Sequence, residues 1–130
     1  MGFGIKIDPT DQALSLFIRK RDRYKCQRCG KFYPEGKGLQ CSHFVGRACN
    51  ATRFDPDNCC ALDTGCHQYF ETHQATYYRD FMIKRLGEQK FKMLEFRART
   101  TLQLGGGDKL LLKKSFEEMT RALPEVETNW

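Results

Sequence analysis

Apolar residues recur at helical spacing near the start of the chain, where Leu14 and Phe17 fall on one face. Asp8 can cap the helix that they predict, and Pro9 suits its first position because proline has no N–H to leave unpaired. We therefore expect a helix over about 9–22.

The middle of the chain has shorter apolar runs, which are typical of strands. Residues 39–44 and 59–62 predict two short strands that run out and back, and residues 46–57 between them predict a polar loop. From Thr64 onward apolar and aromatic residues again fall at helical spacing. We expect a helix there, bent or broken within its length, that stops at Gly87.

Two further helices are expected after Gly87. The first begins near Phe91 and ends before the Gly105-Gly106-Gly107 run, and the last is capped by Asp108 and stopped by Pro124. We interpret the triple glycine as a flexible hinge. It divides the chain into a domain over 1–104 and a C-terminal helical arm over 105–130.

Helices mixed with two strands predict an α+β fold, in which the last helix packs on its own domain or on a second copy of the chain. The second arrangement would make the protein a homodimer.

The composition adds a basic charge and many cysteines. The 130 residues carry a net charge of +6 and include seven cysteines. Excess Lys and Arg favours a nucleic-acid partner, although ordinary surface charge gives the same balance. We see no membrane-spanning run, and the segment Met1–Lys6 lacks the apolar run of a signal peptide. We therefore expect a cytoplasmic protein, in which clustered cysteines indicate metal or catalysis before disulfides.

A Cys-x-x-Cys turn stands at Cys26 and Cys29, followed by Gly30 where a tight turn needs positive φ. Such a turn presents two thiolates to one zinc ion, which prefers four tetrahedral ligands. A thioredoxin-like redox pair is the alternative, but no βαβ pattern surrounds the turn.

The second half of the zinc site is less regular. Cys66 supplies one ligand, and the position three residues before it is Asp63 where a second Cys would be expected. Asp63 can ligate zinc through oxygen, which predicts a structural site of Cys26, Cys29, Asp63 and Cys66. Cys60 and Cys41 compete for the fourth place.

A second constellation lies between these cysteines and indicates phosphodiester hydrolysis. His43 ends the first predicted strand and can accept a proton from water near neutral pH. His67 opens the following helix, where it can hold a divalent cation against a phosphate, and Glu71 lies one turn later on the same face. We expect Asn58 to tie the loop between the strands and hold His43 in place.

These segments resemble the HNH, or ββα-metal, nuclease superfamily, and more narrowly the lambda NinG/Rap family of phage recombination endonucleases. The resemblance rests on Cys26-Gln27-Arg28-Cys29-Gly30, Leu39-Gln40-Cys41-Ser42-His43-Phe44, Thr52-Arg53-Phe54-Asp55-Pro56-Asp57-Asn58, Cys66-His67-Gln68-Tyr69-Phe70 and the segment from Tyr78 to Glu88. It implies a small zinc-stabilised ββα-metal core flanked by an N-terminal helix and C-terminal helices.

The resemblance also implies roles for single residues. His43 would be the general base, Asn58 would support the hairpin, and His67 would be a catalytic metal ligand. It further implies Mg²⁺ or Mn²⁺ as catalytic cation and branched recombination intermediates as the DNA substrate. Many HNH enzymes carry a metal-ligating Asp directly before the first His, whereas this chain has Ser42 there. The cation would then depend on His67, Glu71, water and phosphate.

Arginines near the motif are the candidate DNA contacts. Arg47 and Arg53 lie in the loop beside the expected active site, and Arg28 lies within the Cys-x-x-Cys turn. Guanidinium groups match phosphate oxygens, so these contacts would grip the backbone without reading sequence.

The reading that these features favour is a metal-dependent, structure-selective DNA endonuclease. The alternatives are a zinc-stabilised nucleic-acid-binding module without catalysis, and an HNH restriction or homing nuclease with sequence preference.

Overall fold

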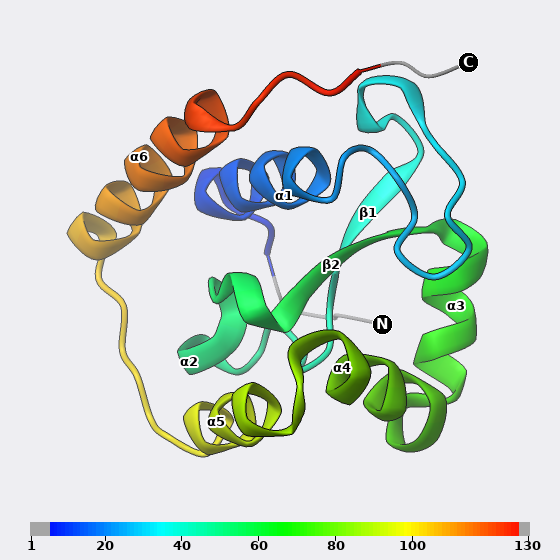
Figure 1. Ribbon diagram of the computed structural model, residues 1–130. Helices are drawn as coiled ribbons and strands as arrows, with labels where there is room; N and C mark the ends of the chain where they lie inside the picture. Colours follow the sequence, from blue (N-terminus) through cyan, green and yellow to red (C-terminus); the bar gives the residue numbers. More distant parts are fainter. Residues whose placement is uncertain (1–5, 128–130) are drawn as a thin grey trace.

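The computed structural model describes residues 6–127, which form six α-helices and a two-stranded antiparallel sheet (Figure 1). The predicted α+β class is confirmed. Residues 1–5 of the predicted domain and residues 128–130 of the predicted C-terminal arm lie outside the described residues. Our expectation that the N-terminus is not a signal peptide rests mostly on residues 1–5.

The N-terminal helix α1 spans Pro9–Arg21, as the sequence predicts. The Asp8 side chain accepts hydrogen bonds from the backbone N–H groups of Thr10 and Asp11, and the Asp11 side chain accepts the Asp8 N–H in return. This reciprocal capping box satisfies donors that a helix start otherwise leaves unpaired.

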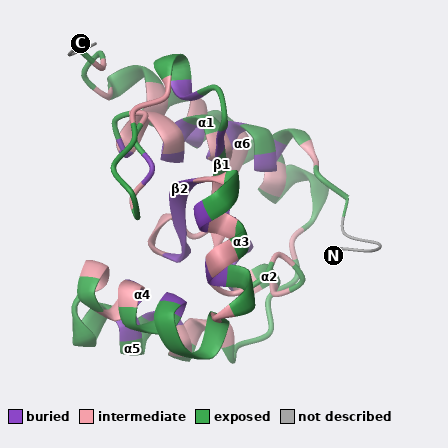
Figure 2. Cartoon of the chain, turned by 90° about the vertical axis from the view of Figure 1, so that its right-hand side faces the viewer, coloured by how far each residue is buried: buried purple, intermediate pink, exposed green. Residues whose placement is uncertain are grey.

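The predicted hairpin is confirmed. Strands β1 (Leu39–His43) and β2 (Cys59–Asp63) pair so that Leu39 faces Asp63 and His43 faces Cys59. The hairpin occupies the centre of the fold, and β2 is almost entirely buried (Figure 2).

The connection between the strands is more ordered than the polar loop that we predicted. It contains the short helix α2 (Asn50–Arg53) and a 3₁₀ turn η2 (Pro56–Asn58). No side chain caps α2. Its backbone is held by contacts from the returning segment, including Asn58 Nδ2 to the Thr52 carbonyl at 3.1 Å.

The expected bent helix after the hairpin is also present. It consists of α3 (Thr64–Thr72), a π-helical turn η3 (Gln74–Tyr78) and α4 (Arg79–Leu86). Gly87 then ends it with a φ of 84°, a value that favours glycine.

The two C-terminal helices begin earlier than predicted. Helix α5 spans Glu88–Ala98 and starts directly after Gly87, and α6 spans Gly106–Ala122. Asp108 is the third residue of α6, not its cap, and its carboxylate accepts the Gly105 N–H at 3.1 Å. Two of the three glycines predicted as a hinge therefore lie in the first turn of α6.

Helix α6 packs on α1, which lies between α6 and the hairpin (Figure 1). The Phe17 and Phe116 rings stack with centroids 6.3 Å apart. At the two ends of this contact, Thr10 Oγ1 donates to the Lys109 carbonyl and Lys20 Nζ donates to the Thr120 carbonyl. The last helix thus packs on its own chain.

Two apolar clusters fill the two sides of the hairpin. One joins β2 to α3, η3, α4 and α5, and its fully buried members include Leu62, Tyr78 and Leu94. The other joins β2 to α1, to α6 and to Phe54, which directly follows α2. Within residues 6–127, no helix is both long and apolar enough to cross a lipid bilayer.

Candidate functional site

The strongest candidate site is the predicted cysteine cluster. The ligand atoms of Cys26, Cys29, Asp63 and Cys66 all lie within 4.8 Å of one another. Tetrahedral zinc with sulfur at about 2.3 Å requires sulfurs about 3.8 Å apart, so small side-chain movements would close this set on an ion. The cluster can hold a metal such as zinc, and its three thiols with one carboxylate suit that ion.

Asp63 is fixed within the cluster by several contacts. Its Oδ1 accepts the Cys66 N–H at 2.9 Å, which caps α3, and its Oδ2 accepts the Tyr33 hydroxyl at 3.0 Å and the Cys29 thiol at 3.2 Å. The Cys66 N–H is the largest of the influences that lower the pKa of Asp63, to about 2. The carboxylate is therefore ionised and available to a cation.

The competitors for the fourth place lie elsewhere. Cys60 is fully buried in the core, where burial raises the pKa of its thiol to about 12. Cys41 belongs to a different group of potential ligands with His43 and Cys59. The geometry therefore groups Asp63, and neither competitor, with the three thiols.

The thiols of the cluster differ in how readily they ionise. Burial opposes ionisation of Cys26, but backbone hydrogen bonds from residues that include Cys29 and Arg28 lower its pKa overall. Burial raises the pKa of Cys66 to about 12, although Arg28 Nη1 lies 3.5 Å from its sulfur. A bound cation would therefore have to displace the Cys66 proton, as zinc does when it binds thiols.

His43 stands at the end of β1 with one nitrogen engaged. Its Nε2 lies 2.8 Å from the Arg53 carbonyl oxygen. A carbonyl can only accept, so Nε2 carries the proton of the neutral ring and Nδ1 holds the lone pair. Burial is the main reason that the pKa of His43 lies below 6.5, and the nearby Arg47 charge lowers it further. The ring is therefore a neutral proton acceptor at pH 7.

Asn58 makes the loop-bracing contacts that the sequence suggests. It is fully buried, its Oδ1 accepts the Val45 N–H at 2.8 Å, and its Nδ2 donates to the carbonyls of Val45 and Thr52 at 2.8 and 3.1 Å. These bonds join the end of β1 to α2. They hold the segment that carries both His43 and its Arg53 partner.

His67, in the first turn of α3, lies between two oxygen-bearing side chains. Its Nδ1 contacts Gln40 Oε1, and its Nε2 lies 2.9 Å from a Glu71 carboxylate oxygen. Sequence reasoning missed Gln40. No local signal marks Gln40, because it meets His67 only when the hairpin and α3 come together.

Ser42, the neighbour of His43 in β1, points into the core of the protein. It is buried, and its hydroxyl lies 2.7 Å from the Tyr78 hydroxyl. The residue that stands where many HNH enzymes have a metal-binding Asp is thus part of the core in this chain.

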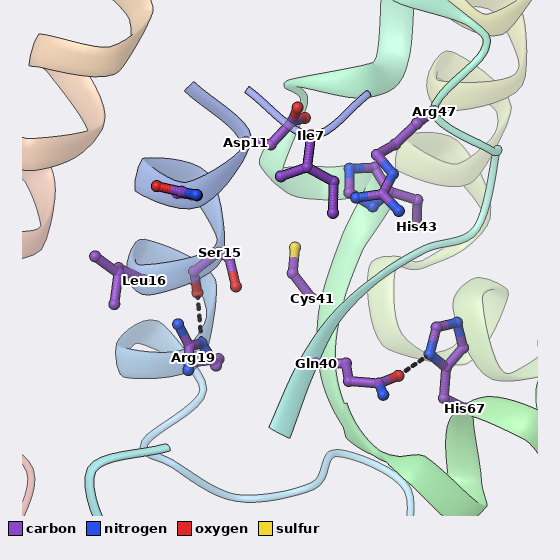
Figure 3. Close-up of a pocket in the computed structure, with 11 residues that line it drawn as sticks. Ile7, Asp11, Ser15, Leu16, Arg19, Gln40, Cys41, His43, Arg47 and His67 are labelled. Carbon is purple, nitrogen blue, oxygen red and sulfur yellow. Dashed lines mark hydrogen bonds between the residues drawn. The ribbon is translucent and has the colours of Figure 1, made fainter. Parts of the chain in front are cut away.

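His43 and His67 both line one open cleft of about 710 Å³, His43 beside Arg47 and His67 beside Gln40 (Figure 3). Helix α1 supplies one wall, through residues that include Asp11 and Arg19, and β1 with the following loop supplies the other. The side of β1 contributes Gln40, Cys41, His43 and Arg47, and α3 contributes His67.

The predicted DNA-contacting arginines differ in their surroundings. Arg47 lines the cleft and is half-buried. Arg28 is exposed, with its guanidinium 3.8 Å above the centre of the Tyr69 ring. Both remain able to meet a phosphate.

Arg53, the third arginine predicted to contact DNA, is occupied inside the protein. Its side chain is buried and forms a forked ion pair with Asp11, from Nη2 at 2.6 Å and from Nε at 3.1 Å. Nη2 also donates to the Lys6 carbonyl at 2.8 Å. The guanidinium is used inside the protein to join α1 to α2.

One of the comparisons with known proteins agrees with the narrower resemblance seen in the sequence, to the lambda NinG family. No curated protein and no solved structure matches the chain. A family model described as bacteriophage lambda NinG protein matches residues 5–125. Since this match covers nearly the whole sequence, the chain belongs to the bacteriophage lambda NinG protein family.

Proposed function

We propose that the protein is an HNH-type, metal-dependent DNA endonuclease that acts on branched recombination intermediates in the cytoplasm of a phage-infected cell. The observation that carries this proposal is that His43 and His67 line the same cleft, beside Arg47. A proton acceptor, a cation ligand and a phosphate-binding group are the parts that phosphodiester hydrolysis needs.

His43 would act as the general base. The Arg53 carbonyl fixes the ring through Nε2, which leaves the Nδ1 lone pair to take a proton from the attacking water. Water then attacks phosphorus and the bond to the 3′ oxygen breaks. Family resemblance implies products with 5′-phosphate and 3′-hydroxyl ends.

The catalytic cation would be held by Nε2 of His67 and the Glu71 carboxylate, which lie 2.9 Å apart, whereas Gln40 lies at Nδ1 on the other side of the ring. This mixed nitrogen and oxygen set fits Mg²⁺ or Mn²⁺ that keeps several water ligands. Such an ion would polarise the scissile phosphate and stabilise the charge on the leaving oxygen. The zinc that we assign to Cys26, Cys29, Asp63 and Cys66 would have a structural role, because its ligands tie the turn before β1 to the start of α3.

DNA would be gripped through its backbone. Arg47 and Arg19 both line the cleft, and the net charge of +6 favours a polyanion. Contacts of this kind do not read base sequence, which suits an enzyme that selects DNA shape. A symmetric cut across a junction would need two copies of the chain.

The direct test is cleavage of a labelled Holliday junction, a D-loop and a linear duplex in Mg²⁺, Mn²⁺ or EDTA. We expect cutting of the branched substrates that needs a divalent cation and is lost in His43→Ala. His73→Ala is the matched control, because His73 lies between α3 and η3 outside the cleft-lining set. Cutting of the linear duplex at preferred sequences would instead favour a restriction or homing nuclease.

One observation favours a second candidate, a zinc-stabilised nucleic-acid-binding module without catalysis. Ser42 replaces the metal-binding Asp of many HNH enzymes and bonds to Tyr78 inside the core. DNA binding by the intact protein with no cleavage in either cation would support this module and refute the nuclease.

A further inference from the structure

A second group of potential metal ligands lies on the hairpin, separate from the cluster at Asp63. The ligand atoms of Cys41, His43 and Cys59 all lie within 4.8 Å of one another. In the strand register His43 faces Cys59 and Cys41 faces Ala61, so the three residues share one side of the sheet.

We propose that Cys41, His43 and Cys59 form a binding site for a soft divalent cation of the zinc class, and that its occupation switches off the base. The switching part rests on the proposed nuclease function. The binding part stands on this geometry alone.

The site is reachable from the cleft. Cys41 and His43 both line the cleft, on the wall opposite α1 (Figure 3). Cys59 is 1% exposed and lies behind them, against the apolar cluster shared with α1 and α6. A cation entering from the cleft would meet Cys41 and His43 first, then Cys59, and would keep a position open toward solvent for water.

The donor set decides which cation binds. Two thiols and an imidazole favour Zn²⁺ or Cd²⁺, whereas Mg²⁺ prefers oxygen ligands and octahedral geometry. Elsewhere on the cleft, His67 and Gln40 offer a nitrogen and an oxygen, and the Glu71 carboxylate lies 2.9 Å from His67. The protein therefore presents a soft ligand set and a harder one, which different cations would occupy.

Occupation of the soft site would compete directly with catalysis. Because Nε2 of His43 donates to the Arg53 carbonyl, Nδ1 is the nitrogen whose lone pair can meet a metal. The same lone pair would take the proton from water. A ring bound to a soft cation would therefore be unable to act as base, and Mg²⁺ would not relieve this because it does not compete for thiolates.

The binding part is tested by titrating the chelator-treated protein with Cd²⁺ and following thiolate-to-metal absorbance. We expect the wild type to bind one more thiolate-ligated ion than Cys41→Ser. Cys49→Ser is the matched control, since Cys49 belongs to neither ligand group of the described residues, and it should bind as many ions as the wild type. Equal numbers in the wild type and Cys41→Ser would overturn the site.

Cys41 is the preferred position because it is half-buried, so a serine there disturbs the core less than a substitution of buried Cys59 does. Cys59→Ala, checked for folding by circular dichroism, provides a second variant and should lose the same ion. Retention of the additional ion in folded Cys59→Ala would contradict our ligand set.

The switching part is tested by adding micromolar Zn²⁺ to cleavage reactions in excess Mg²⁺, each variant being compared with its own zinc-free rate. We expect zinc to inhibit the wild type and Cys49→Ser at least about tenfold more than Cys41→Ser, a difference of about 1.4 kcal/mol. Equal inhibition of all three would refute the switch. If no variant cleaves DNA, the nuclease proposal fails and the Cd²⁺ titration still decides the site.

Discussion

The buried ion pair between Arg53 and Asp11 gives the sharpest test of the structure, because the sequence had suggested that Arg53 binds DNA. We consider Arg53→Met, which keeps much of the side-chain volume and removes the charge. In the structure this loses two hydrogen bonds to the Asp11 carboxylate and one to the Lys6 carbonyl. It also leaves a buried carboxylate without its cation.

The expected cost follows from that burial. The side chains of Arg53 and Asp11 are 10% and 4% exposed, so solvent screens the pair weakly. Removing one partner of a buried pair typically costs about 3–5 kcal/mol. Asp11 keeps the Asp8 N–H at 2.9 Å, so we expect the lower end of the range, about 3 kcal/mol.

Urea unfolding measures this loss. With a slope of about 1–3 kcal/mol per molar urea, the unfolding midpoint of Arg53→Met should fall by about 1–3 M. The double variant Asp11→Asn/Arg53→Met should lose less than the sum of the single variants, because the unpaired charge is removed as well. Arg47→Met, in the same loop but at the cleft, should leave the free energy of unfolding within about 0.5 kcal/mol of the wild-type value.

The two arginine variants should have the opposite effects on DNA affinity. Below its unfolding range, Arg53→Met should bind DNA as the wild type does, whereas Arg47→Met should bind less tightly and with a smaller dependence on salt. Unchanged stability together with weakened DNA binding in Arg53→Met would refute our account of this pair.

Three more outcomes are expected. Asn58→Ala leaves the half-buried Val45 N–H and carbonyl and the buried Thr52 carbonyl without their partner, and should cost about 2–4 kcal/mol in urea unfolding. Exposed Asn50→Ala should cost about 0.5 kcal/mol or less, and similar losses in the two variants would contradict the bracing role. Because burial lowers the pKa of His43, the base stays neutral to lower pH, and the acid limb of the cleavage profile should have its midpoint below pH 6.5; a midpoint above 7 would argue against this base. Asp63→Asn removes a charged ligand and should weaken zinc retention against a chelator by at least about tenfold, whereas retention equal to wild type would place the fourth ligand elsewhere.

Features set by local sequence could be predicted. The capped start of α1, the two short strands and the stop at Gly87 each depend on residues within a few positions of one another. The spacing of Cys26 and Cys29 likewise pointed to a shared metal, and the structure brings Asp63 and Cys66 to the same place.

Features that depend on contacts between residues far apart in the chain could not be predicted from the sequence. Arg53 looked like a free loop arginine because its partner Asp11 is 42 residues away in the chain. Helix α2 has no side-chain cap, so nothing within its four residues marks it. Gln40 gains significance only when the hairpin and α3 bring it against His67.

The contact between α1 and α6 has a consequence for the order of folding. Thr10 is bonded to a residue 99 positions later, and Lys20 to one 100 positions later. One wall of the cleft is therefore secured by a helix that the ribosome synthesises after every residue of the cleft itself. Contacts of such long range are slow to form, so we expect the hairpin and its cysteine cluster to assemble first and the cleft to be completed only after α6 has been synthesised.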